Sequence, residues 1–465
     1  MQRRPIALLV AILALAATGC GGGSEDEPAA DGGALEVWIE ENQPDRVAAM
    51  RANVADFTRR TGIKVDLVPL GDDEQLPRTA AAAKKGTLPD VMQISMAEAH
   101  RYAGQGILDT GAAQQTVEEL GEDTFSARAL SLLTMSGSVA AVPSDGWGQL
   151  LIYRKDLFDA AGLPTPETLA DVQRAARRLG RPGRAGITLA TAPDDGFTSE
   201  TFEHVALAAG CQLVADTGEV NLDSPACRRA FEVYVDLARN ASPGGVQDVD
   251  TTRDAYFAGR AAMIFWSPFL LDAMAGLRDD AVPSCRQCEA DPAYLARNSG
   301  LVGPLRGGTG EAAAQYGNIT TWGISAKGDV ANARRFVRYM LSDGYLRWLA
   351  LSPQGKYPVR AGDGADLERF VRGWEQLESG VERRAPLERF YRPASIASLG
   401  DGVRSFQRWG FEDGHAGLVG ALGDDQPVVD ALVKAIRGEI TPRQAAEEAS
   451  AAVAKLQGSI EQPSG

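Results

Sequence analysis

Five cysteines are the residues whose spacing most limits the chemistry of this chain. Four of them form two close pairs, Cys211 with Cys227 and Cys285 with Cys288. The CRQC spacing of the second pair is also found in redox and zinc sites, but no second CxxC follows, and the three histidines are far apart in the sequence. We therefore expect two structural disulfide bonds, provided that the protein resides in an oxidising compartment.

The fifth cysteine, Cys20, ends an N-terminal segment typical of bacterial lipoprotein signals. Two arginines precede an apolar run from Ile6 to Ala17, and small residues then lead to Cys20. The run is shorter than the roughly 20 residues that a membrane-spanning helix needs. We predict a signal peptide over residues 1–19 and acylation of Cys20, which would anchor the mature protein to the outer face of the cell membrane. An ordinary secretory signal with a structural cysteine is the alternative.

The next segment, residues 20–34, reads CGGGSEDEPAADGGA. Glycine, acids, proline and alanine without apolar periodicity cannot bury a core, so we predict a lipidated cysteine followed by a flexible tether. About 430 residues of globular composition remain, which exceeds the roughly 250 to 300 at which single cores stop growing. The sequence therefore predicts two lobes or domains.

The net charge of −15 argues against a nucleic-acid partner, because it repels phosphate backbones. The sequence contains no GxSxG, HExxH or GxxxxGK motif, and a partial GxGxxG at Gly308 and Gly310 lacks its third glycine. We predict no catalytic residue, no metal ligand and no cofactor. A glycan-active enzyme stays open as an alternative, because two carboxylates can meet in space without any fixed sequence spacing.

Apolar patterns predict strands that alternate with helices. Residues 35–39 and 63–68 indicate two strands, and the helix between them has apolar residues at positions 47, 50, 54 and 57 and ends at Gly62. Further strands are expected after Pro89 and over residues 150–153, and further helices around Phe231 and Phe336. The pattern predicts an α/β fold in which helices cover mixed or parallel sheets.

Six segments, in sequence order, carry a resemblance to a known family. They are LEVWIEENQPD with the following FTRRTGIKVDLVPL; GTLPDVMQIS; VPSDGWGQLLIYRKDLFDAAGLPTPETLADV; AYFAGRAAMIFWSPF; NITTWGISAKGDVANARRFVRYMLSD; and SPQGKYPVR. They resemble the extracellular solute-binding proteins of ABC importers, in particular the maltose-binding-protein-like, sugar-binding family. The resemblance spans most of the mature chain.

This resemblance implies a two-lobed periplasmic-binding-protein-like fold with a ligand cleft between lobes joined by crossing strands. The crossings would lie near residues 143–147, 302–307 and 355–360. Lobe 1 would combine residues 35–143 with 307–354, and lobe 2 would combine residues 147–303 with 360–460. Such a cleft closes by hinge rotation.

The resemblance also implies which residues face a sugar, whose hydroxyls suit amides and carboxylates and whose C–H faces suit aromatic rings. The implied ligand-binding residues are Glu41, Asn42, Ser95, Asp145, Trp147, Trp266, Phe269, Asn318 and Trp322. Phe269 stands where the family has a stacking tryptophan. Ile94 stands where the maltose-binding protein has an aromatic residue, which argues against maltodextrins as the ligand.

By resemblance, the protein captures a mono- or oligosaccharide outside the cytoplasm as a monomer and delivers it to an ABC permease without a cofactor. Three alternatives remain. A receptor of the same fold for polyamines or other cations would suit the acidic composition. A ligand sensor without transport and a secreted glycan-active enzyme are the others.

Overall fold

The structure, a computed structural model, describes residues 33–193, 195–411 and 414–461. The predicted signal peptide, Cys20 and nearly all of the predicted tether lie outside the described residues. From Ala34 onward the chain belongs to one unit. Within the described part, every helix is too short or too polar to cross a membrane.

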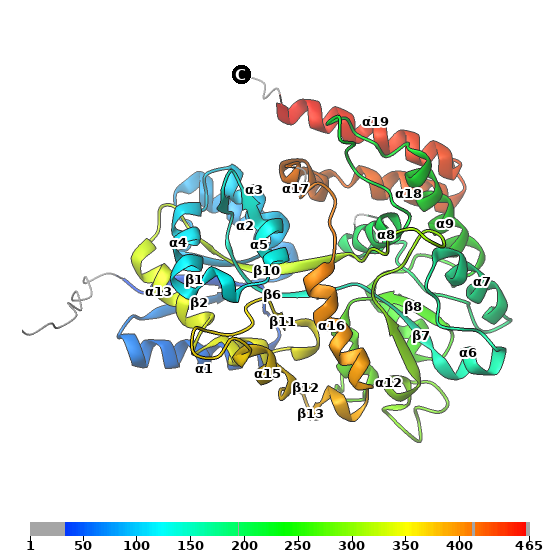
Figure 1. Cartoon of the computed structure of the whole chain (residues 1–465), viewed down its shortest axis with the longest axis horizontal. Coiled ribbons are helices and arrows are strands. Elements are labelled where there is room, and N and C mark those ends of the chain that lie inside the picture. Colours follow the sequence, from blue (N-terminus) through cyan, green and yellow to red (C-terminus); the bar gives the residue numbers. More distant parts are fainter. Residues whose placement is uncertain (1–32, 194, 412–413, 462–465) are drawn as a thin grey trace, which may run out of the picture. The chain divides into compact units, whose positions relative to one another are not determined.

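A six-stranded mixed sheet forms one half of the fold (Figure 1). Its strand order is β11-β6-β10-β3-β1-β2. The strands are β1 (Leu35–Ile39), β2 (Val65–Pro69), β3 (Val91–Ser95), β6 (Val142–Gly148), β10 (Gly317–Ile324) and β11 (Tyr357–Pro358). Strand β1 pairs in parallel with β2 and β3, whereas β10 runs antiparallel to both β3 and β6.

A three-stranded antiparallel sheet forms the other half, with the order β8-β7-β9. Its strands are β7 (Leu150–Arg154), β8 (Met263–Trp266) and β9 (Ser299–Val302). Two short hairpins complete the strand inventory of the described residues: β4 (Thr134–Met135) with β5 (Ser138–Val139), and β12 (Glu378–Ser379) with β13 (Ala385–Pro386).

Helices surround both sheets (Figure 1). Those near the first sheet are α1 (Pro44–Thr61), α2 (Asp72–Lys85), α3 (Met96–Gly104), α4 (Thr110–Leu120), α5 (Ala127–Leu133), α13 (Val330–Met340) and α14 (Tyr345–Leu349). Those near the second are α6 (Lys155–Ala161), α7 (Leu169–Leu179), α8 (Gly196–Ala208), α9 (Pro225–Asn240), α10 (Val249–Phe257), α11 (Leu271–Met274) and α12 (Tyr294–Asn298). The C-terminal helices are α15 (Arg369–Glu375), α16 (Pro393–Ser405), α17 (Ala416–Asp425), α18 (Pro427–Arg437) and α19 (Pro442–Glu461).

The chain passes between the two sheets through extended segments. Strand β6 ends at Gly148 in the first sheet, and β7 begins at Leu150 in the second. The chain leaves the second sheet after β9 and re-enters the first as β10. A short 3-10 helix, η3 (Pro353–Gly355), then leads into β11 beside β6. The strands that join the two halves therefore lie next to one another.

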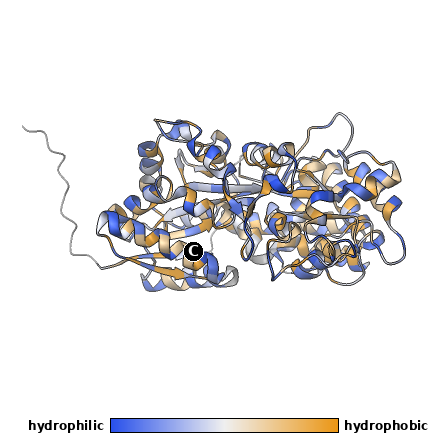
Figure 2. Cartoon of the chain, turned by 90° about the horizontal axis from the view of Figure 1, so that it is seen from below, coloured by the Kyte–Doolittle hydropathy of each residue, from blue (hydrophilic) through white to orange (hydrophobic). Residues whose placement is uncertain are grey.

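The first helix illustrates why these residues adopt these elements. All four apolar positions that the sequence singled out, Val47, Met50, Val54 and Phe57, are buried, so the helix packs one face on the sheet. Gly62 ends α1 with a φ of 76°, a left-handed conformation that glycine adopts without a steric penalty. The prediction of a β-α-β unit is confirmed. Along the helices, hydrophobic and hydrophilic residues alternate, as expected for helices with one buried face (Figure 2).

The C-terminal segment contacts elements of both halves. Helix α17 packs against α3, and Arg101 of α3 donates a hydrogen bond to the carbonyl oxygen of Gly420. Helix α16 lies against β6 and α5, whereas α18 and α19 pack against α9. Elements of this segment thus contact both halves. The lobe boundaries expected from the sequence stay a prediction.

Both cysteine pairs form disulfide bonds in the structure, Cys211–Cys227 and Cys285–Cys288. All four cysteines are buried. The first bond ties the residue stretch after α8 to the first turn of α9. The second closes a tight loop between α11 and α12.

Replacing both Cys211 and Cys227 by alanine should lower the free energy of unfolding by about 3 kcal/mol, because this bond closes a loop with a sequence separation of 16. The matched change at Cys285 and Cys288, with a separation of 3, should cost less, about 2 kcal/mol. Urea unfolding without reductant measures both values. A larger loss for the shorter loop would contradict this ranking.

Candidate functional site

A buried lysine joins the strands where the two halves meet. The ammonium group of Lys356, directly before β11, lies 2.8 Å from a carboxylate oxygen of Glu41 and 3.8 Å from one of Asp145 in β6. The three side chains are between 1% and 8% exposed. Lys356 also lies 4.0 Å from the ring centre of Trp348, whose indole N–H donates a hydrogen bond of 2.5 Å to Asp145. These groups link β1, β6, β11 and α14.

The two carboxylates of this group differ in their protonation behaviour. Burial would raise the pKa of Glu41, but the charges and hydrogen bonds of Lys356 and Arg46 outweigh it and lower the pKa to about 2. Burial raises the pKa of Asp145, and the more distant Lys356 offsets this only in part. Lys356 is therefore primarily the partner of Glu41. Glu41 has a second cationic partner, Arg46, at 3.0 Å.

Three aromatic residues, Trp147, Phe269 and Tyr316 (the aromatic group), lie beside this charged group. Trp147, near the end of β6, meets Phe269 edge-on at 6.4 Å between ring centres and Tyr316 at 5.8 Å. Phe269 also packs against the backbone of Gly355, where a side chain would clash with its ring. Trp147 and Phe269 are half-buried, so parts of both rings remain accessible. Such surfaces stack against apolar faces of a ligand.

Polar groups of α8 lie next to these rings. The hydroxyl of Tyr316 donates a hydrogen bond of 3.1 Å to Glu200, and the guanidinium of Arg408 lies 4.5 Å from the Tyr316 ring centre. Burial raises the pKa of Glu200 to about 7, against the opposing effects of Arg408 and Tyr316. Arg408 itself pairs with Glu203 at 3.0 Å. Glu200 therefore changes charge near neutral pH, which makes it a proton-sensitive acceptor beside the aromatic group.

A cavity of about 130 Å³ lies between α3, α8 and α17. Its lining includes Ala97 at the start of α3, Ser199 and Glu203 of α8, and Arg408. The cavity thus joins the end of β3, through Ala97, to the polar groups of α8. In open α/β sheets, ligands bind at the carboxyl ends of the strands, which is the position of Glu41 and Ser95 here.

The structure brings together some of the residues that the sequence singled out. Glu41 and Asp145 meet at Lys356, and Trp147 meets Phe269. Asn318 is paired with Trp147 across β10 and β6 and is half-buried.

The remaining candidates lie elsewhere. Asn42 is exposed, and Ser95 caps α3 by accepting a hydrogen bond from the backbone of Glu98. Trp266 packs against Phe197 at 4.7 Å. Trp322 is fully buried against Trp348 and Phe336, because α13 and α14 cover this part of β10.

Sequence reasoning missed Lys356, Glu200, Tyr316 and Arg408. Lys356 stood inside the SPQGKYPVR segment, where a lysine at a crossing strand could have been weighed as a partner for the nearby acids. The other three had no recognisable pattern, because residues of α8, the segment before β10 and the segment after α16 meet only in the folded chain. Within the described residues, no group of three or more histidine, cysteine, aspartate or glutamate side chains could hold a metal ion.

Comparisons with known proteins agree with this architecture. A family model described as bacterial extracellular solute-binding protein matches residues 41–346. YcjN of Escherichia coli (strain K12), named as an ABC transporter periplasmic-binding protein, is 28% identical over 334 residues, which are 70% of this chain and 73% of that protein.

Solved structures share the fold. Maltose-bound MalE3 of T. maritima has a TM-score of 0.70 at 18% identity and covers 91% of this chain and 100% of its own. A solute-binding protein of an ABC transporter from Agrobacterium vitis, with bound D-mannitol, has a TM-score of 0.66 at 20% identity and covers 93% of this chain and 100% of its own. The fold is therefore the two-lobed fold of these proteins, as the sequence predicted.

Replacing Lys356 by methionine should destabilise the protein by about 3 to 5 kcal/mol at pH 7, because Glu41 and Asp145 would stay buried without their cation. Urea unfolding measures this, and Lys327→Met at an exposed lysine is the control, with a change near zero.

The same pair makes stability depend on pH. Because the pKa of Glu41 is about 2 in the folded state and near 4.5 when unfolded, its contribution is present above pH 5 and is lost as the pH falls toward 2. Lys356→Met should weaken this acid-side loss. If Lys356→Met left both the free energy of unfolding at pH 7 and its decrease at acidic pH unchanged, the lysine would not stabilise this junction.

Proposed function

Because the chain belongs to the family of bacterial extracellular solute-binding proteins, we propose that it is the substrate-binding component of an ABC importer and captures a carbohydrate. Members of this family are extracellular, so the protein acts outside the cytoplasm. The observation that carries the choice of ligand is the aromatic group of Trp147, Phe269 and Tyr316 beside the polar groups of α8. The relatives named for maltose and mannitol support a saccharide or sugar alcohol as the ligand class.

The proposed binding mode uses the half-buried rings for the sugar's C–H faces and polar side chains for its hydroxyls. Trp147 and Phe269 would stack, while Asn318 and Glu200 would accept or donate hydrogen bonds. Asn42, Ser95 and Trp266 remain proposed ligand-binding residues, at the edge of the site. Glu41 and Asp145 are engaged by Lys356, so their part in binding is to fix the junction that carries Trp147. Trp322 would support the site from within the core.

The proposed cycle is non-covalent. Ligand contacts both halves, and the closed form is the one that a permease recognises, so a ligand that favours closure signals loading. The strands that join the halves lie side by side at Lys356, which suits a hinge. The relatives are binding proteins, and we propose no catalysis, a monomeric state and the lobe division given by the sequence.

We also propose that the mature protein is lipid-anchored through Cys20. The support is the basic, apolar and small-residue order of the first 20 residues and the extracellular family. The glycine- and acid-rich residues 21–34 would give the folded part reach from the membrane surface.

The ligand class is tested by a thermal-shift screen of the chain from Gly21 onward against sugars, sugar alcohols, polyamines and amino acids, because a ligand of the folded state raises the melting temperature. Calorimetry on the best compound then measures affinity and detects turnover. We expect a shift with one sugar class and no product. A shift with polyamines alone would favour the cation receptor, and glycan turnover would identify an enzyme.

Trp147→Ala and Phe269→Ala should each lower the affinity for the sugar found in that screen by about tenfold, because a lost stacking contact costs about 1 kcal/mol or slightly more. Calorimetry measures both affinities, and the melting temperature without ligand checks folding. Phe390→Ala, at a half-buried phenylalanine outside the aromatic group, is the matched control and should bind as the parent does. Unchanged affinity in both tryptophan and phenylalanine variants would refute this placement of the site.

Cys20→Ser should move the protein from the membrane fraction to the soluble fraction, because the acylated thiol is lost. Fractionation of cells followed by immunoblotting measures the distribution. A serine variant that still needs detergent for release would contradict the anchor.

A further inference from the structure

A pocket of about 670 Å³ lies in the second half, away from the aromatic group. We call it the α7–α10 pocket; its lining comes from residues 180–186, 240–247 and 251–260. Arg260 of this lining precedes β8, whose other end, Trp266, pairs with Leu150 where the chain crosses between the sheets. Helix α7, whose C-cap Gly180 borders the pocket, lies at the outer side of the second half (Figure 1). The pocket is therefore separate from the candidate binding site.

A tight turn places two arginines side by side on the α7–α10 pocket. Arg181 and Arg184 exchange both of their backbone N–H to carbonyl hydrogen bonds, each 2.9 Å long. Between them, Pro182 and Gly183, with a φ of 81°, are typical of a type II turn. Residues that exchange both bonds have Cα atoms about 5.5 Å apart and point their side chains to the same face. Both arginines line the pocket.

A third arginine lies next to this turn. Ala185 and Ala261 form a parallel bridge, and the backbone N–H of Ala185 donates a hydrogen bond of 2.7 Å to the carbonyl oxygen of Arg260. The residues directly before this bridge, Arg184 and Arg260, are therefore neighbours whose side chains share a face. Arg260 also lines the pocket, so three neighbouring guanidinium groups belong to one lining.

Two of these cations have no partner. Within the described part of the chain, the exposed side chains of Arg181 and Arg260 form neither an ion pair nor a hydrogen bond. Arg184 donates a hydrogen bond of 2.9 Å to the carbonyl oxygen of Leu179, which carries no full negative charge. The carboxylate of the lining, Asp254, pairs instead with Arg253 at 3.3 Å.

The three positive charges repel one another. Burial and the nearby charges of Arg181 and Arg154 lower the pKa of Arg184. Like charges at adjacent positions of paired strands are destabilising, and a bound anion would remove that cost. The chain carries a net charge of −15, so a group of neighbouring cations without acidic partners is a local reversal of its charge.

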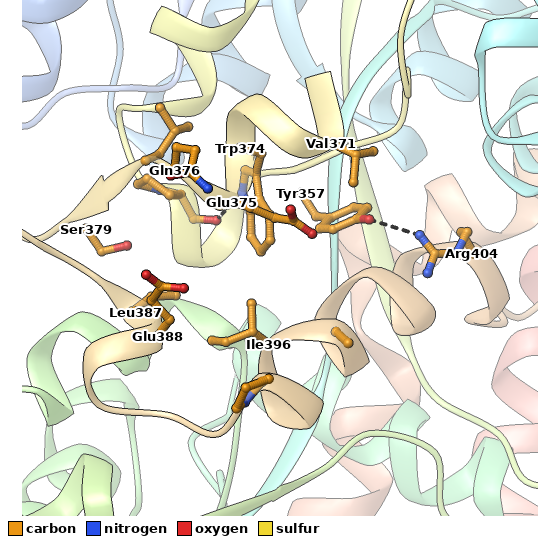
Figure 3. A pocket seen from close by; sticks show the side chains of 14 residues that line it. Tyr357, Val371, Trp374, Glu375, Gln376, Ser379, Leu387, Glu388, Ile396 and Arg404 are labelled. Atoms are coloured by element: carbon orange, nitrogen blue, oxygen red, sulfur yellow. Dashed lines mark hydrogen bonds between the residues drawn. The ribbon is translucent and has the colours of Figure 1, made fainter. Parts of the chain in front are cut away.

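The pocket between α15 and α16 shows the opposite arrangement (Figure 3). Its volume is about 460 Å³, and the cation in its lining is Arg404. This guanidinium donates a hydrogen bond of 2.9 Å to the hydroxyl of Tyr357 and pairs with Asp401 at 2.7 Å. The arginine of that pocket is thus engaged within the protein, whereas two arginines of the α7–α10 pocket are not.

We propose that the α7–α10 pocket binds a phosphate group, carried either by a soluble compound or by an anionic lipid headgroup. Arg181 and Arg260 donate hydrogen bonds to the phosphate oxygens, and Arg184, held by Leu179, adds a third positive charge. A guanidinium group suits this role because it can donate two parallel hydrogen bonds to one phosphate. Open space around the backbone of Gly183 and Gly244 leaves the pocket accessible. This site does not depend on the proposed carbohydrate function.

Calorimetry at low ionic strength with inorganic phosphate tests the site, and acetate serves as the singly charged comparison. We expect phosphate to bind at least about tenfold more tightly than acetate, because it carries more charge and more acceptor oxygens. The double variant Arg181→Gln/Arg260→Gln should lower the affinity for phosphate by at least about tenfold, and its melting temperature checks folding.

The matched control is Arg335→Gln/Arg389→Gln, which removes the same charge at two exposed arginines that do not line the pocket. It should leave the affinity for phosphate close to that of the parent. An equal loss in both double variants would overturn the proposal, since the net charge and not the pocket would then determine binding.

Sedimentation of the chain from Gly21 onward with vesicles distinguishes the two sources of phosphate. One set of vesicles contains phosphatidylcholine alone and the other also contains phosphatidylglycerol. Binding to the second set that is lost in Arg181→Gln/Arg260→Gln identifies a headgroup site, and phosphate binding without vesicle binding identifies a site for soluble phosphate compounds. The proposal is overturned if neither phosphate nor phosphatidylglycerol vesicles bind, if acetate binds as tightly as phosphate, or if Arg181→Gln/Arg260→Gln retains the parent's binding.

Discussion

The buried ion pair of Lys356 and Glu41 is the interaction on which the rest of the structure depends. Removing three charged groups from water is costly, and the cost is offset only when the geometry is close and each group is paired. Here the pairing draws together the end of β1, the middle of β6 and the start of β11. These segments are far apart in the sequence, so the pair acts as a long-range constraint where the chain crosses between its two sheets. Hydrophobic packing on either sheet alone would not specify this junction.

The aromatic group depends on that junction. Trp147 follows Asp145 by two residues in β6, and Phe269 rests on the backbone of Gly355, directly before Lys356. Fixing the three charged side chains therefore fixes both rings. Trp147 belongs to β6 of the first sheet, whereas Phe269 follows β8 of the second. A ligand at these two rings would touch both halves, so rotation about the crossing strands would change its contacts. The ion pair at the junction and the accessible rings beside it are therefore coupled through the same short segments of the chain.

Local patterns predicted much of the fold. The spacing of Val47, Met50, Val54 and Phe57 and the glycine at position 62 located α1 and its end, because helix periodicity and a left-handed cap are properties of neighbouring residues. The two cysteine pairs form the disulfide bonds that their short sequence separations suggested.

The residues of the candidate binding site were harder to predict from the sequence than the fold was. Trp322 lies on the same face of β10 as Asn318, yet α13 and α14 cover it, and no local pattern reveals which part of a strand a distant helix will cover. Glu200 and Arg408 meet Tyr316 from separate segments, which only the folded chain brings together.

In the proposed function, a sugar binds between the two halves and closes them. Small-angle X-ray scattering of the chain from Gly21 onward, without ligand and with the sugar that binds most tightly in solution, measures this closure. If the sugar closes the two halves, the radius of gyration is smaller at saturation than without ligand, at the same molecular mass. An identical radius of gyration with the site saturated, as judged by calorimetry on the same sample, would contradict closure around the ligand.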